Sequence, residues 1–182
     1  MNKIFSLILI LITLPLLLII SVLIVYSSGR PVLHWSKRIG KNNKEFFMPK
    51  FRTMKNNTPQ KATHLMLDEE NYITGFGSFL RKTSLDEVPQ LFSILRGQMN
   101  FIGPRPALFN QHDLMRLRIL HGIDKQKPGI TGWAQVNGRD NLSIEEKIKV
   151  EKYYYENKSL NLQIKILIMT LIKLLKRDQI SH

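Results

Sequence analysis

The chain opens with a long apolar run, in which residues 4–26 read IFSLILILITLPLLLIISVLIVY. Lys3 is the only charged residue among the first 26. At about 1.5 Å per residue, a helix of this length can cross a hydrocarbon core of about 30 Å. We therefore expect a membrane helix within residues 1–29 and a separate folded body after it.

The flanks of the run and its central proline bear on topology. A cleaved signal peptide is an alternative, but its apolar core has about 7–15 residues, and residues 26–29 form a poor cleavage site. Basic residues follow the run, so the positive-inside rule places the body in the cytoplasm. Pro15 favours a kink near the centre. The residues alone leave open whether the helix crosses the membrane or turns back.

The composition excludes some classes of protein. The chain has 182 residues, with Lys+Arg 27, Asp+Glu 14 and no Cys, which excludes a disulfide scaffold and a cysteine-based metal site. The five His residues lack the spacing of metal ligands. The net charge of +13 favours anionic partners, and residues 30–158 have a length that suits one cytoplasmic catalytic domain.

This body is expected to mix helices and strands. Residues 32–37 and 45–51 are strand candidates around the turn-rich residues 40–43, which predicts a β-hairpin. The apolar spacing over residues 85–95 is helical. Ser143 begins a capping box that predicts a helix to about residue 157. The fold class is therefore a small, mixed α/β membrane-associated domain.

A second amphipathic segment covers residues 160–177. One face carries a leucine and isoleucine stripe and the opposite face carries basic residues, which is typical of a helix at a membrane interface. The stripe consists of Leu160, Ile164, Leu167, Ile168, Leu171, Leu174 and Leu175. The alternative is a helix packed on the protein itself, which Ile166 and Met169 on the basic face favour. We assign residues 159–182 to an interfacial helix and tail.

Asp86 and Glu87 are adjacent carboxylates at the expected start of the helix over residues 85–95. Two carboxylates at one place are candidates for nucleophilic and metal-binding chemistry. The structural alternative is a capping box formed by Ser84 and Glu87. Pro89 fits a first helical turn under either interpretation.

Several basic residues lie in turn-rich segments around these carboxylates. They are Lys50, Arg52, Arg81, Lys82, Arg96, Arg105 and Arg139. Arg in rigid loops suits phosphate, because its planar guanidinium binds two phosphoryl oxygens together. The combination suggests phosphoryl transfer, with one acid holding Mg²⁺ and the other attacking phosphorus. Solvated cations, or cations that bind lipid or nucleic acid, remain the alternative.

Four ordered motifs resemble the bacterial sugar transferase family, the small monotopic phosphoglycosyl transferases. They are KFRTM at residues 50–54, FLRKTSLDEVPQL at 79–91, GPRP at 103–106 and PGITGWAQVNGR at 128–139. The resemblance extends from the apolar run to Lys176 and Arg177. It implies transfer of a sugar 1-phosphate from a UDP-sugar to polyprenol (undecaprenyl) phosphate with release of UMP. That reaction begins capsule, O-antigen or glycoprotein glycan synthesis.

The resemblance also implies roles for particular residues. Asp86 is the nucleophile of a covalent phospho-sugar intermediate, and Glu87 holds Mg²⁺. Lys50, Arg52, Arg81, Arg105 and Arg139 contact substrate. By the same resemblance, Pro15 breaks a re-entrant helix, and the enzyme lies on the cytoplasmic face of the bacterial inner membrane. Its partners then include membrane lipids and no nucleic acid.

The chain departs from the family pattern at a few positions. Thr13 is the hydroxyl residue available to bond a carbonyl freed by Pro15. Gln98, Glu151 and Gln163 replace common Asp or acidic residues, which we interpret as local changes of hydrogen bonding or capping. Two rival functions remain: a membrane-tethered basic binding protein for anionic lipid or nucleic acid, and a glycosyltransferase that releases UDP.

Overall fold

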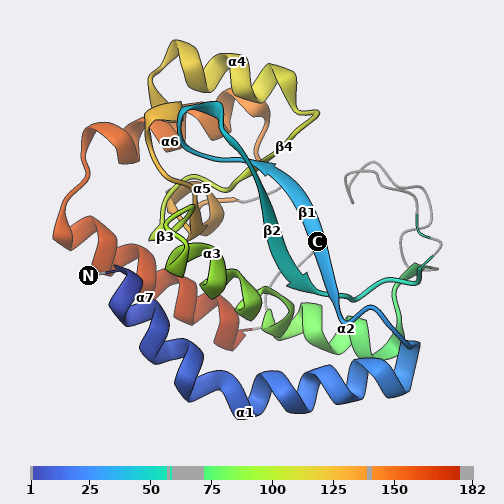
Figure 1. The fold of residues 1–182 in the computed structure, drawn as a ribbon. Coiled ribbons are helices and arrows are strands. Elements are labelled where there is room, and N and C mark those ends of the chain that lie inside the picture. The colour runs from blue at the N-terminus through green and yellow to red at the C-terminus, as the bar shows by residue number, and fades with distance from the viewer. Residues whose placement is uncertain (1, 57, 59–71, 139–140, 177–182) are drawn as a thin grey trace.

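The computed structural model describes residues 2–56, 58, 72–138 and 141–176 (Figure 1). The α-helices are α1 (Asn2–Ser28), α2 (Gly75–Lys82), α3 (Leu91–Leu95), α4 (His112–Leu120), α5 (Trp133–Val136), α6 (Ile144–Glu156) and α7 (Leu160–Lys176). The strands are β1 (Leu33–Ile39), β2 (Glu45–Phe51), β3 (Asn100–Ile102), β4 (Ala107–Leu108) and β5 (Gly129–Thr131). Short 3₁₀ helices are η1 (Lys41–Asn43), η4 (Leu85–Gln90) and η5 (Ile123–Lys125). The predicted mixture of helices and strands is confirmed.

The hairpin of β1 and β2 is the centre of the body. The two strands pair antiparallel from Leu33 opposite Phe51 to Ile39 opposite Glu45. Asn42 and Asn43 have positive φ in the connection, a conformation that Asn adopts more readily than most residues. The second strand has the predicted bounds, whereas the first extends past the predicted end at residue 37. β4 adds to the free edge of β1, and β3 pairs parallel with β5 in a separate two-stranded sheet.

Helix α1 lies along one side of the body and bends near its middle (Figure 1). Its first half packs through Ile10 against a cluster that includes Met48 and Ile94. Its second half packs through Ile20 and Ile24 against a cluster that includes Phe51 and Leu80. Both halves of the helix therefore contact the same body.

Polar contacts fasten the first half of α1. Asn2 Nδ2 donates to Asn100 Oδ1 at 3.0 Å, and Ser6 Oγ donates to the Leu91 carbonyl at 2.7 Å. The Thr13 hydroxyl donates to the Leu9 carbonyl at 2.7 Å. The carbonyl that Pro15 deprives of its helical donor is four residues back, at Leu11, so the expected support from Thr13 reaches a different carbonyl. Such a hydroxyl contact favours bending of a helix.

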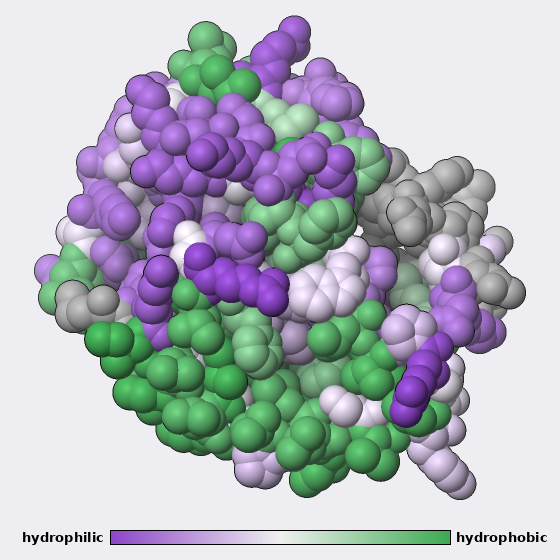
Figure 2. Space-filling model, viewed as in Figure 1, coloured by the Kyte–Doolittle hydropathy of each residue, from purple (hydrophilic) through white to green (hydrophobic). Residues whose placement is uncertain are grey.

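The outward side of α1 forms an apolar surface. Figure 2 shows hydrophobic residues gathered along the edge of the molecule that α1 occupies, whereas most residues in the upper part of that view are hydrophilic. Exposed side chains of the helix include Leu11, Ile12 and Val22, each more than 60% exposed. Among the described residues, α1 is the one helix with the length and apolar composition to span a membrane. An apolar surface of this extent indicates contact with a membrane or another apolar partner.

Helix α7 combines the two arrangements considered from its sequence. Ile166 is fully buried in a cluster with Val136 and Tyr154, and Met169 packs against that cluster. Every residue of the predicted apolar stripe is exposed, including Leu171 at 59%. The side that carries Ile166 therefore packs on the body while the stripe faces outward.

The burial of α1 residues predicts a stability difference between two isoleucines of one helix. Ile24 is 1% exposed and Ile19 is 58% exposed. Ile24→Ala is expected to lower the free energy of unfolding by about 2–4 kcal/mol, because it leaves a cavity between α1 and the body. Ile19→Ala, the control, removes the same atoms from an outward position and is expected to change it by less than about 1 kcal/mol. Denaturation of detergent-solubilised protein measures both, and equal losses would contradict the packing.

Candidate active site

The two candidate carboxylates lie in the first turn of η4. Asp86 is 3% exposed and Glu87 is 9% exposed. Ser84 precedes them in the left-handed conformation, with φ of 55°, and its side chain makes no capping hydrogen bond. The capping-box interpretation of Ser84 and Glu87 is therefore wrong. Both carboxylates are instead directed into the protein.

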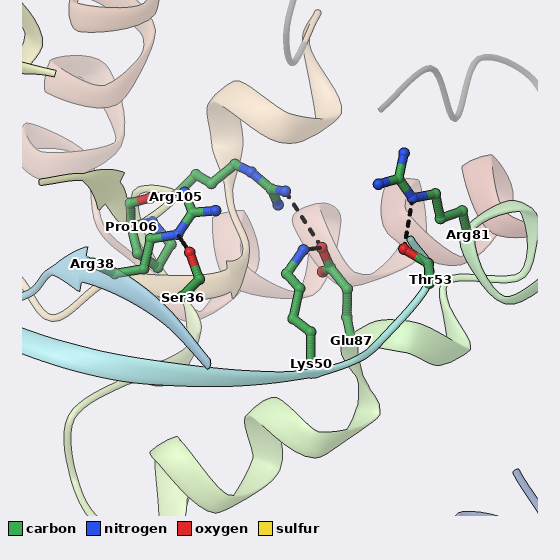
Figure 3. Close-up of polar contacts among 8 residues, drawn as sticks. All are labelled: Ser36, Arg38, Lys50, Thr53, Arg81, Glu87, Arg105 and Pro106. Atoms are coloured by element: carbon green, nitrogen blue, oxygen red, sulfur yellow. Dashed lines mark hydrogen bonds and ion pairs between the residues drawn. The ribbon is translucent and has the colours of Figure 1, made fainter. Parts of the chain in front are cut away.

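Glu87 is held by cations from two other parts of the chain. Lys50 Nζ, from β2, donates to Glu87 Oε1 at 2.8 Å, and Arg105 Nη2 lies 3.3 Å from the same oxygen (Figure 3). Burial lowers the pKa of the Lys50 ammonium, and the negative charge of Glu87 opposes that shift. Lys50 and Arg105, which lie 37 and 18 positions from Glu87 in the sequence, thus contact the same carboxylate oxygen.

Asp86 differs from Glu87 because one of its oxygens has no partner. Its Oδ1 is buried and has no hydrogen bond. Burial raises the pKa of Asp86 to about 6, and the charge of Glu87 adds to the rise, whereas Lys50, Arg81 and Arg105 oppose it. A buried acceptor without a donor is uncommon in proteins, and a carboxylate with a perturbed pKa is a candidate functional residue.

Two further cations lie around the site, Arg38 from β1 and Arg81 from α2 (Figure 3). Arg81 Nε donates to Thr53 Oγ1 at 2.9 Å. Arg38 Nε donates to Ser36 Oγ at 2.9 Å, and its Nη1 donates to the Pro106 carbonyl at 3.2 Å. Arg38 is not among the site residues predicted from the sequence. Alternation along the full strand, which puts Arg38 on the face of Ser36, was the signal that could have found it.

Arg52 is engaged elsewhere. Its guanidinium donates to the carbonyls of Ser28 and Gly29 at 2.7 and 2.5 Å, and to the carbonyl of Arg30 at 3.0 Å. It also bonds Asn56. These carbonyls end α1, where a cation is favourable because the helix dipole is negative there. Arg52 thus caps α1, and its role in substrate binding stays a prediction. Arg139 lies outside the described residues.

The two glycine-rich motifs meet at the turn that carries Arg105. A Cβ at Gly129 would lie 2.1 Å from the Gly103 nitrogen, and one at Gly132 would lie 2.0 Å from the Gly103 oxygen. Only glycine permits these backbones to approach so closely. The motifs therefore place the Arg105 turn against β5, and with it the guanidinium that reaches Glu87.

The carboxylates of the site suit a metal ion that takes its remaining ligands from water and substrate. Among the described residues, no group of three or more His, Cys, Asp or Glu side chains is placed to hold a metal ion. Mg²⁺ often uses only one or two carboxylates and completes its shell with water and phosphate oxygens. The adjacent Asp86 and Glu87 match that requirement.

Comparison with known proteins identifies the family. The family described as "Bacterial sugar transferase" matches residues 1–177. The chain belongs to the bacterial sugar transferase family. It is therefore related to enzymes, and the cluster of Asp86, Glu87 and their cations is the candidate active site of a sugar transferase.

Three relatives illustrate the range of this family. "Uncharacterized sugar transferase EpsL" of Bacillus subtilis (strain 168) is 38% identical over 154 residues, which cover 85% of this chain and 75% of the relative. "UDP-glucose:undecaprenyl-phosphate glucose-1-phosphate transferase" of Xanthomonas campestris pv. campestris is 39% identical, covering 88% and 35%. "UDP-N-acetylgalactosamine-undecaprenyl-phosphate N-acetylgalactosaminephosphotransferase" of Aeromonas hydrophila is 36% identical, covering 85% and 37%. This sugar transferase thus spans about a third of the length of the latter two.

The raised pKa of Asp86 predicts that Asp86→Asn stabilises the protein at neutral pH. Because the pKa of Asp86 is higher in the folded protein than in the unfolded chain, the unfolded chain releases this proton first as the pH rises. The free energy of unfolding therefore falls between about pH 4 and about pH 6. The variant lacks this loss and is expected to be more stable at pH 8 by up to about 3 kcal/mol. The difference should shrink towards pH 4. Thermal unfolding across this range measures it, and a less stable variant at pH 8 would contradict the assignment.

Proposed function

We propose that this sugar transferase moves a sugar 1-phosphate from a UDP-sugar to polyprenol (undecaprenyl) phosphate and releases UMP. The observation that carries the proposal is the buried Asp86, whose Oδ1 has no hydrogen bond. The positive charges of Lys50, Arg81 and Arg105 favour the ionised form of this carboxylate. Relatives named for transfer of glucose 1-phosphate and of N-acetylgalactosamine phosphate both have undecaprenyl phosphate in their names. The names support the acceptor and leave the sugar open.

In the first displacement, a carboxylate oxygen of Asp86 attacks the phosphorus that bears the sugar. The bond from this phosphorus to the bridging oxygen of the diphosphate breaks, and UMP leaves with that oxygen and its electron pair. The sugar phosphate remains bonded to the Asp86 carboxylate as an acyl phosphate. A pKa of about 6 leaves the carboxylate ionised at neutral pH, and the surrounding cations stabilise the charge that develops on the phosphoryl oxygens.

In the second displacement, an oxygen of polyprenol phosphate attacks the same phosphorus. The bond to Asp86 breaks, which restores the carboxylate and yields the polyprenol-diphosphate sugar. Two displacements at one carboxylate allow UMP to depart before the lipid acceptor binds. A soluble donor and a membrane-bound acceptor can then use one small site in turn.

Glu87 is the residue proposed to hold Mg²⁺. When bound, the ion neutralises charge on phosphate oxygens. Lys50 and Arg105 keep the Glu87 carboxylate in place beside Asp86. Arg81, fixed by Thr53, and Arg38, fixed by Ser36, supply further cations for the diphosphate of the donor.

We further propose that α1 enters and leaves the membrane from the cytoplasmic face of the bacterial inner membrane. The proposal is supported by contacts of the body with both ends of the helix, through Asn100 at Asn2 and through Arg52 at Ser28. The bend near Pro15 and the exposed stripe of α7 agree with a protein embedded in one leaflet. This arrangement keeps the active site near the headgroups of membrane lipids, within reach of a lipid-linked phosphate.

The reaction predicts UMP as the nucleotide product. Detergent-purified protein with Mg²⁺ and undecaprenyl phosphate, given a panel of UDP-sugars, is expected to release UMP from its cognate donor. Asp86→Asn should lower the rate by at least about 10³-fold, because it removes the attacking oxygen. Asp113→Asn, a matched change at an exposed position of α4, should leave the rate unchanged.

Other products would decide against this reaction. UDP release would indicate glycosyl transfer without the phosphate. Absence of nucleotide release from every donor, together with salt-sensitive binding of anionic lipid or nucleic acid that Asp86→Asn leaves intact, would indicate a tethered binding protein.

The re-entrant topology predicts labelling from one side. The chain has no cysteine, so single cysteines at position 2 and at position 41 of the exposed hairpin connection can be compared directly. Both are expected to react with a membrane-impermeant thiol reagent only in inverted vesicles or after permeabilisation. Modification of the cysteine at position 2 in intact spheroplasts would instead establish a helix that crosses the membrane.

A further inference from the structure

A buried ion pair lies behind the candidate active site, between α4 and α6. Arg118 is 7% exposed and Glu151 is 3% exposed. Arg118 Nη2 donates to Glu151 Oε1 at 2.6 Å and its Nε donates to Oε2 at 2.8 Å, so the contact is bidentate. Of the two interpretations of Glu151, a change of hydrogen bonding or of capping, the contacts match hydrogen bonding. The change is not local, because Glu151 neutralises the guanidinium of a residue 33 positions away.

The same guanidinium makes a third contact, which leads to the active site. Arg118 Nη2 also donates to the carbonyl oxygen of Arg105 at 2.9 Å. The side chain of Arg105 reaches Glu87 at 3.3 Å. Polar contacts thus run without a gap from Glu151 through Arg118 and Arg105 to Glu87.

The turn that carries Arg105 is held almost entirely from outside. Three successive carbonyls each accept from a different element: that of Pro104 from the Gly129 nitrogen, that of Arg105 from Arg118, and that of Pro106 from Arg38. The two prolines have no N–H, and their rings fix φ. With the main chain fixed at three consecutive points, the direction in which the Arg105 side chain leaves the turn is also fixed.

A buried ion pair is not an efficient way to add stability. The loss of hydration of two charges offsets much of their attraction, and apolar replacements of similar volume are often as stable. What an apolar pair cannot supply is a donor for the Arg105 carbonyl. The Arg118 fork supplies it while Glu151 neutralises the charge and fixes the guanidinium plane.

We propose that Arg118 and Glu151 are positioning residues that hold the main chain of the Arg105 turn, so that the Arg105 guanidinium is aligned with Glu87 and the donor diphosphate. The inference rests on the proposed function and adds two residues to it. Neither residue touches substrate, and both act through Arg105.

A double-mutant cycle separates positioning from general stabilisation. Arg118→Lys keeps the charge but loses the planar fork, and is expected to lower kcat/KM for UMP release at least about 10-fold with little loss of thermal stability. In an Arg105→Ala background the same change is expected to cost less than about 2-fold, because Arg118 acts through a side chain already removed. Equal effects in the two backgrounds, or no effect in either, would overturn the proposal.

Matched controls lie on the same two helices. Arg116→Lys changes an exposed arginine of α4, and Glu156→Gln changes an exposed member of the Lys152–Glu156 ion pair of α6. Both are expected to retain full activity. Glu151→Gln should reproduce the loss of Arg118→Lys, and Glu151→Asp, which keeps the charge, should restore part of it. Full activity of Glu151→Gln would contradict a role for the ion pair.

A second readout does not depend on the proposed reaction. Hydrogen exchange of the backbone amides within residues 103–108, which are those of Gly103, Arg105, Ala107 and Leu108, is expected to rise in Arg118→Lys and to stay unchanged in Arg116→Lys. If wild-type protein releases no UMP from any donor, the proposed function fails while this measurement still tests the positioning. Unchanged exchange at residues 103–108, or a rise spread over the whole chain, would overturn it.

Discussion

The contact of two cations with one carboxylate oxygen of Glu87 is the constraint around which the body is arranged. Lys50 brings the hairpin to that oxygen and Arg105 brings the turn after β3. Because buried charges are costly unless paired, the three groups hold one another in place. Asp86, one residue earlier, is then left buried with an oxygen that has no donor. The two adjacent acids therefore differ, since Glu87 is paired with two cations and Asp86 keeps an oxygen without a hydrogen bond.

The same hairpin connects this group of charges to the apolar helix α1. Lys50 and Arg52 are two residues apart on or just after β2, yet Lys50 contacts Glu87 and Arg52 caps the end of α1. Ile24, in the last turns of α1, packs in the cluster that contains Phe51. Three successive residues at the end of one strand, Lys50, Phe51 and Arg52, therefore contact both the candidate active site and the second half of α1. The first half of α1 is held separately, through Ser6 and Ile10.

Sequence patterns predicted the local features well and the long-range contacts poorly. The strand over residues 45–51 and the capping box of Ser143 are confirmed, because alternation and capping depend on neighbouring residues. The capping box predicted for Ser84 and Glu87 failed for another reason. The partners of Glu87, Lys50 and Arg105, are far away in sequence, and nothing local distinguishes a capping glutamate from one that pairs with them. The partner of Glu151 is equally distant in sequence. The motifs indicated that Lys50, Glu87 and Arg105 belong to one site. The three-dimensional structure was needed to show that both cations contact the same oxygen of Glu87.

The central claim is that Asp86 forms a covalent bond to the sugar phosphate, and intact-protein mass spectrometry tests it most directly. Wild-type protein incubated with Mg²⁺ and its cognate UDP-sugar, without polyprenol phosphate, should gain the mass of one sugar phosphate. Peptide mapping should place the added mass on Asp86, and undecaprenyl phosphate should remove it. An unmodified protein that still releases UMP only when acceptor is present would contradict the account and indicate direct transfer between the two substrates.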